Sequence, residues 1–279
     1  MKNMKTKLCS LFACFMLLSP ALVLAQGPGN NIQTVVPDGR EESDSIPVGT
    51  ATTYLFSAQA GHSYSVEQSR GMSRPIIPMM VFGGCPGSSA NDTSTMAPEV
   101  TLNIGFPQQR QRIAFTCPGP VFPPPSPNYA QAMIPNFNGG AAYNFSISVT
   151  DTTLFSEKWK ATSNADTFWT FTNSSSAPVH VGLILLDAFG NQLGQNPPIT
   201  INPGATFSID TTQMPQLPRN PPGGGPFSLT GSALASEDGP PGAIRATEVI
   251  VTTAGGPCPS PTCVTTSETV KFATKIQSR

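Results

Sequence analysis

The fold is decided by residues 62–67, which read His-Ser-Tyr-Ser-Val-Glu. His62, Tyr64 and Val66 fall on one side of an extended chain, and the polar residues between them fall on the other. Residues 143–150 repeat this alternation as Tyr-Asn-Phe-Ser-Ile-Ser-Val-Thr. A period of two with one apolar and one wet face predicts antiparallel strands.

Similar short runs continue along the chain, separated by Gly and Pro turns. They predict strands at 52–58, 76–82, 100–104, 112–116, 168–173, 179–186, 206–210, 227–234, 243–253 and 264–276. Strands of this length at this spacing are typical of antiparallel β-sandwiches of the jelly-roll or immunoglobulin-like kind. We therefore predict an all-β protein with two such domains in tandem.

Two segments lead to more specific expectations. Residues 179–186 are apolar at both alternating sets of positions, which predicts a central strand covered on each side, with His180 in the core. Residues 118–140 contain proline clusters, and proline cannot donate to a strand ladder. We expect this second segment to be a surface loop.

The composition agrees with a β-rich fold. Only 11% of the 279 residues are charged, and the chain contains 30 Pro and 25 Gly, which counts against long helices and coiled coils. The apolar fraction of 38% is large enough for a buried core.

Residues 1–25 are predicted to be a cleaved signal peptide. Lys2, Lys5 and Lys7 precede an apolar run over 8–24, which ends in small residues at Ala25. We expect the mature protein to be secreted or periplasmic, without membrane association. Its expected organisation is a flexible acidic segment over 26–45, a first β-sandwich domain over 46–151 and a second over 152–279.

The net charge of the mature chain indicates which partners it can bind. Cleavage after Ala25 removes three of the 15 basic residues and none of the 16 acidic ones, which leaves 12 basic against 16 acidic residues. An acidic surface without basic clusters cannot gather phosphates, so nucleic acid is not expected as a partner.

Four cysteines remain after cleavage: Cys85, Cys117, Cys258 and Cys263. Four cysteines allow three disulfide connectivities. Proximity favours a Cys85–Cys117 and a Cys258–Cys263 pair, which suits an oxidising compartment. A four-thiolate zinc site is the alternative, although no Cys-x-x-Cys motif supports it.

The first half resembles the bacterial pre-peptidase C-terminal domain. The resemblance rests on Tyr-Leu-Phe-Ser-Ala at 54–58, Ala-Gly at 60–61 and the two alternating segments, and it covers about residues 45–150. It implies a small β-sandwich that serves secreted proteins as an accessory, adhesion or calcium-assisted module. The proline-rich insertion departs from the family's short loops. The second half looks like β-sandwich regions of uncharacterised exported bacterial proteins.

No catalytic residue is predicted. The sequence lacks Gly-x-Ser-x-Gly, Ser-x-x-Lys, phosphate-loop and His-Glu-x-x-His motifs. A hydrolase needs a base that a third group orients, and neither His62 nor His180 has a recognisable partner nearby in sequence. We expect both histidines to be structural.

Calcium is the candidate cofactor. Asp38, Glu41, Glu42 and Asp44 could supply the hard oxygen ligands that Ca²⁺ prefers, although their spacing does not match an EF-hand. The alternative is a solvated entry segment. The same two interpretations apply to the Glu-Asp-Gly segment at 237–239.

Aromatic side chains are the candidate ligand-binding residues. Trp159, between two lysines, is expected to be half-exposed, and Trp169 to pack in the core or to stack on a ligand. Phe122 and Tyr129 lie in the proline-rich segment and could face a partner. The sequence thus favours an exported, non-enzymatic binding protein for cell-surface carbohydrate or protein. A secreted hydrolase with loop-borne carboxylates and a calcium-stabilised module remain the alternatives, and the oligomeric state is open.

Overall fold

The protein is all-β. The computed structural model describes residues 30–71, 77, 79–82, 108–117, 128–137, 140–214, 217, 228–253, 265–271 and 273–274. Over these residues the chain forms strands and one 3-10 turn, Thr211–Gln213, and no α-helix. Within the same ranges there is accordingly no helix of the length and apolarity that a membrane span requires. The predicted fold class is confirmed at this level.

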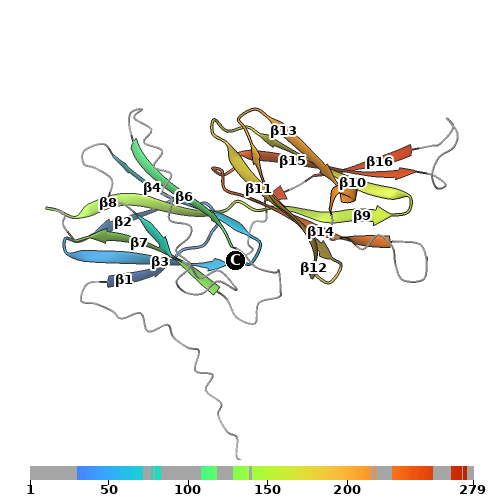
Figure 1. Ribbon diagram of the computed structural model, residues 1–279. Helices are drawn as coiled ribbons and strands as arrows, with labels where there is room; N and C mark the ends of the chain where they lie inside the picture. Colours follow the sequence, from blue (N-terminus) through green and yellow to red (C-terminus); the bar gives the residue numbers. More distant parts are fainter. Residues whose placement is uncertain are drawn as a thin grey trace, which may run out of the picture.

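The strands up to Asp151 form two four-stranded sheets, which lie on the left in Figure 1. The first sheet has the order β1 (Asn30–Thr34), β3 (Thr50–Ala58), β7 (Asn128–Asn136), β5 (Met80–Phe82). The second has the order β2 (Glu42–Ile46), β8 (Tyr143–Asp151), β4 (Ser63–Gly71), β6 (Gln108–Thr116). Buried side chains of both sheets form one apolar cluster. We call residues 30–151 the N-terminal half.

The alternation that predicted the strands decides which side chains fill this cluster. In β8, Tyr143, Phe145, Ile147 and Val149 are buried, while the residues between them are exposed or half-buried. Burying one large apolar side chain contributes about 1.5–3 kcal/mol. The apolar face of β8 therefore fixes which side of the strand turns inward.

The strands from Leu154 onward form one nine-stranded sheet in two parts. The parts are joined where β9 (Leu154–Thr162) turns into β10 (Ala165–Asn173), through the single residue pair Thr162–Ala165. In the first part, β9 pairs with β14 (Ser228–Glu237) and with β17 (Ala273–Thr274). Next to β14 lies β11 (Val179–Asp187), and next to β11 lies β12 (Gln192–Ile201). In the second part, β10 pairs with β13 (Thr206–Asp210) and with β15 (Ile244–Thr253), and β15 pairs in turn with β16 (Thr265–Lys271). Buried residues of both parts share a second apolar cluster, which makes this C-terminal half sandwich-like.

The structure corrects two expectations about loops. Residues 128–136, expected within a surface loop, are strand β7. Pro135 is tolerated because β7 pairs there with β3 alone, so its missing N–H faces away from the ladder. Residues 30–34 and 42–46, expected in a flexible segment, are strands β1 and β2, and β1 pairs with β3 in parallel.

Gly231 provides a test of the packing in the C-terminal half. A Cβ atom at this position of β14 would lie 1.8 Å from the main-chain oxygen of Leu186, which is also the acceptor for the indole N–H of Trp159 at 2.9 Å. We expect Gly231→Ala to lower the free energy of unfolding by about 3 kcal/mol or more. Chemical denaturation measures this, and Gly140→Ala, which has nothing within 4 Å, is the control. Equal stability of the two variants would contradict the packing.

Candidate functional site

The described part of the protein contains a surface hollow of about 670 Å³ on the second sheet of the N-terminal half. We call it the β2–β8–β4 hollow. It is lined by Ser43, Asp44, Ser45, Ser69, Arg70, Asn144, Phe145 and Ser146. Its volume falls within the range of small-molecule sites. Most of the lining residues carry polar side chains.

The hollow arises from the register of the three strands. Pairing between β4 and β8 ends at Ser69–Ser146, whereas β8 continues to pair with β2 as far as Tyr143–Ile46. Beyond Ser146, β4 therefore no longer accompanies β8. Ser43 pairs with the same Ser146 from the other side, so three serines form a row across the sheet where the strands diverge.

Arg70 is held at the wall of the hollow by aromatic packing. Its guanidinium carbon lies 4.3 Å from the centroid of the Tyr143 ring, a cation–π distance, and Tyr143 stacks on Phe145 at 5.1 Å. The main-chain N–H of Ile77 donates to the Tyr143 hydroxyl at 3.1 Å. Stacking occupies a face of the guanidinium, and its N–H donors lie around the edge. The Tyr143 ring thus fixes the position of the Arg70 guanidinium.

Asp44 is the acidic member of the lining. Its Oδ2 accepts hydrogen bonds from the Tyr54 hydroxyl at 2.5 Å and from Gln33 Nε2 at 3.0 Å. Burial and the hydrogen bond to Asp44 raise the pKa of Tyr54 well above its ordinary value, so the phenol stays protonated and donates. The carboxylate is thus oriented by neighbours before any ligand arrives.

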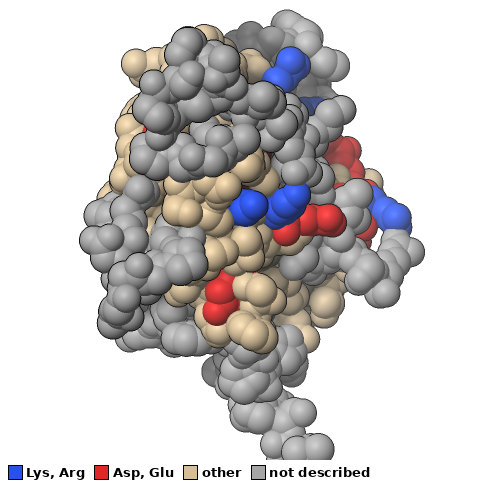
Figure 2. All heavy atoms as spheres, turned by 90° about the vertical axis from the view of Figure 1, so that its right-hand side faces the viewer, with Lys and Arg blue, Asp and Glu red and all other residues tan. Residues whose placement is uncertain are grey.

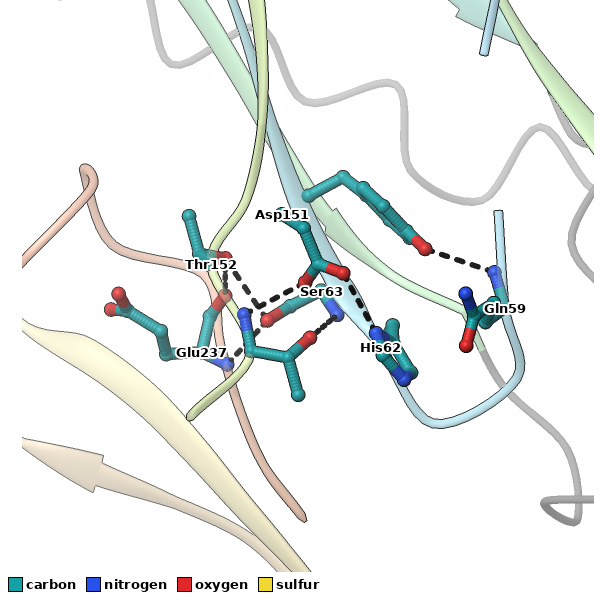
Figure 3. A network of polar contacts seen from close by, with 8 residues as sticks. Gln59, His62, Ser63, Asp151, Thr152 and Glu237 are labelled. Atoms are coloured by element: carbon teal, nitrogen blue, oxygen red, sulfur yellow. Dashed lines mark hydrogen bonds and ion pairs between the residues drawn. The ribbon is translucent and has the colours of Figure 1, made fainter. Parts of the chain in front are cut away.

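A second polar cluster lies where the two halves meet (Figure 3). His62 Nδ1 lies 2.8 Å from Asp151 Oδ2, and these side chains are 4% and 1% exposed. Ser63, the next residue, accepts hydrogen bonds at its Oγ from Thr152 Oγ1 at 3.0 Å and from the Glu237 N–H at 2.9 Å. Asp151 Oδ1 also accepts the N–H of Thr153.

Serine, histidine and aspartate together invite comparison with a hydrolase triad, but the geometry differs. Ser63 and His62 are consecutive in an extended chain, so their side chains point to opposite sides. The Ser63 oxygen receives two hydrogen bonds from other groups, and the three side chains are buried. The cluster has a structural geometry and lacks the serine–histidine contact on which nucleophilic catalysis depends.

His180 corrects an expectation. It was expected in the core of a central strand, and β11 does lie between β12 and β14, but the His180 side chain is 55% exposed. Its Nδ1 lies 2.7 Å from Asp238 Oδ2. Both histidines thus have aspartate partners from distant parts of the sequence, which local sequence could not reveal.

Glu237 has a strongly perturbed carboxyl group. Burial raises its pKa to about 8, with a smaller contribution in the same direction from Asp238, while a hydrogen bond from the Gly239 N–H and the charge of Arg112 act against the shift. A hydrolase was expected to place such a group in a cleft. Glu237 is only 2% exposed, which leaves no path for a substrate to its carboxyl.

The expected aromatic binding residues lie elsewhere. Trp159 and Trp169 are both fully buried, so the expectation of a half-exposed Trp159 is wrong. Trp159 packs in the C-terminal core because its lysine neighbours point to the other side of β9, and Trp169 donates to Glu248 at 2.7 Å. Tyr129 is 40% exposed on β7 but does not line the hollow, and Phe122 lies outside the described residues.

The acidic candidates for calcium do not converge. Asp38, Glu41, Glu42 and Asp44 run along the approach to β2 and the strand itself, and no three His, Cys, Asp or Glu among the described residues gather as metal ligands would. Of the four, Asp44 is the one that lines the hollow.

The cysteine pairings stay predictions. Cys117 is buried at the end of β6, and the other three expected partners, Cys85, Cys258 and Cys263, lie outside the described residues. The expected signal peptide lies outside them as well.

Sequence reasoning missed the hollow. Its signal was present in the polar positions of the alternating strands, such as Asn144 and Ser146, which were assigned only to a wet face. Comparison with protein-family models and with curated proteins finds no match to this chain. The resemblance of the first half to the pre-peptidase C-terminal domain therefore stays a prediction.

The two His–Asp pairs allow a matched measurement. Asp151→Ala leaves His62 and the Thr153 N–H buried without their acceptor, and breaking such a buried pair costs about 3–5 kcal/mol. Asp238→Ala removes the same contact from an exposed pair, where the cost is smaller. We expect thermal and denaturant unfolding to show a much larger loss for Asp151→Ala. Similar losses would contradict the structural role of the buried pair.

Proposed function

We propose that this protein is an exported, non-enzymatic binding protein that recognises a neutral, hydroxyl-rich ligand, a carbohydrate of the cell surface, in the β2–β8–β4 hollow. The proposal includes a cleaved signal peptide over 1–25, two β-sandwich domains, the first extended to residues 30–151 by β1 and β2 and the second over 152–279, disulfides between the mature cysteines and a secreted or periplasmic location. The composition of the hollow carries the functional part of the proposal.

The polar groups in the hollow suit a sugar. Serine hydroxyls both donate and accept, Asn144 offers an amide, and Arg70 contributes a guanidinium whose position is fixed by stacking on Tyr143. Hydrogen-bonding groups that are oriented in advance lose less entropy on binding. Phe145 adds an apolar element to an otherwise polar lining.

Charge favours a neutral ligand. The lining contains one cation, Arg70, and one anion, Asp44, so the hollow has no net formal charge to attract phosphate or polyanion. The charges elsewhere are consistent with this. On the face shown in Figure 2, blue and red side chains lie next to one another, and most of the described surface carries neither.

Binding of the mature protein to immobilised polysaccharides tests the proposal. We expect retention on a neutral polysaccharide and none on single-stranded DNA, with Arg70→Gln lowering the affinity about tenfold, because a hydrogen bond from a charged donor contributes about 1.5–3 kcal/mol. Isothermal titration with soluble oligosaccharide measures the change.

Arg245→Gln is the matched control, because Arg245 is exposed on β15 in the other half of the protein. Its affinity is expected to equal that of the wild type. Equal affinity of Arg70→Gln, at an unchanged melting temperature, would exclude the hollow as the binding site. Absence of retention on every neutral polysaccharide tried would exclude the ligand class.

A further inference from the structure

The end of strand β14 is held by the N-terminal half through its main chain. The N–H of Glu237 donates to Ser63 Oγ at 2.9 Å, and Thr152 Oγ1, which donates its proton to Ser63 Oγ at 3.0 Å, lies 3.3 Å from the Glu237 carbonyl oxygen. Arg112 Nη1, from β6, donates to the carbonyl oxygen of Asp238 at 3.1 Å. We call these polar contacts of residues 237 and 238 the β14 clasp.

The Glu237 side chain points away from the clasp. Figure 3 shows its carboxyl directed away from Ser63. Its Oε2 is buried without a hydrogen-bond partner. The surroundings are tight, because a Cβ atom at Gly239 would lie 2.7 Å from this oxygen, 2.8 Å from a methyl of Val179 and 2.6 Å from Ala243. The carboxyl accepts one hydrogen bond, from the Gly239 N–H, and the burial of its unpartnered oxygen still disfavours a negative charge.

Few charged groups around Glu237 can compensate an ionised carboxyl. Asp238, the next residue, repels it and Arg112 attracts it, while desolvation is the largest influence and raises the pKa of Glu237 to about 8. From β11, His180 is bonded to Asp238 on the outer side of the sheet. The charges at the end of β8 and before β4, Asp151 and His62, are paired with each other.

We propose that the Glu237 carboxyl is a pH-sensitive latch between the two halves, closed while it is protonated and released when it loses its proton to solvent. An ionised carboxylate gains hydration only if the segment around residues 237–239 moves, since the site has no room for water. The main chain of the same residue makes two of the clasp contacts, the hydrogen bond to Ser63 Oγ and the 3.3 Å contact with Thr152 Oγ1. Displacing it therefore breaks the contact between the halves and leaves each apolar cluster intact.

The direction of the pH dependence follows from the raised pKa. A carboxyl whose pKa is higher in the folded protein than the ordinary 4.5 stabilises the closed state fully at pH values below 4.5. This stabilisation declines as the pH rises and is lost as the pH passes through about 8. The latch thus opens on the alkaline side.

Small-angle X-ray scattering of the mature protein between pH 6 and pH 9.5 tests the latch. We expect the maximum dimension of the wild type to be larger at pH 9.5 than at pH 6, because the closed state loses stability as the pH rises toward 8, while the far-ultraviolet circular dichroism of the strands stays constant. Glu237→Gln, which cannot ionise, is expected to keep the closed dimension throughout.

Glu248→Gln is the matched control, because Glu248 is a buried glutamate of β15 bonded to Trp169 within the C-terminal half. It is expected to open over the same pH range as the wild type. A wild-type dimension that is constant with pH would overturn the proposal, as would opening of Glu237→Gln over the same pH range. Loss of the β-sheet spectrum together with the expansion would show unfolding and would also overturn it.

Discussion

Neighbouring side chains of a strand must point to opposite faces, and this constraint shapes each polar site of the protein. His62 and Ser63 are consecutive, so the imidazole reaches Asp151 while the hydroxyl reaches the main chain of β14. Glu237 and Asp238 are consecutive as well, so one carboxyl enters the C-terminal core and the other lies at the surface. In each pair, side chains that are neighbours in sequence therefore lie in different surroundings and bind different partners.

The hollow follows from the same constraint. Tyr143 and Phe145 turn inward and form an aromatic support, and Asn144 and Ser146 turn outward and supply polar groups. Because the aromatic rings are fixed by the core, Arg70 is placed by packing that contributes to stability in any case. A ligand would thus meet groups whose positions were determined when the sheet formed.

Period-two alternation was enough to predict β4 and β8, and aromatic and β-branched content predicted most of β10. Both signals failed at β7, because Ala130 and Ala132 are weak indicators of a strand and Pro135 argued for a loop. The partners of the histidines and the hollow depend on how segments 58, 89 and 103 residues apart in sequence are brought together. Register is a property of the assembled sheet, and a single sequence does not display it.

The meeting of the two halves through polar groups has a physical consequence of its own. An apolar contact tolerates sliding, whereas a hydrogen bond has a preferred direction and length. Any other docking of the halves would leave buried groups such as Ser63 Oγ and the Glu237 N–H without partners, at about 1–3 kcal/mol each. The observed orientation of the two halves is thus selected mainly because other orientations would bury polar groups without hydrogen-bond partners. A single charge added beside such directed contacts acts on the groups that select this orientation, which is why the proposed latch lies at the end of β14.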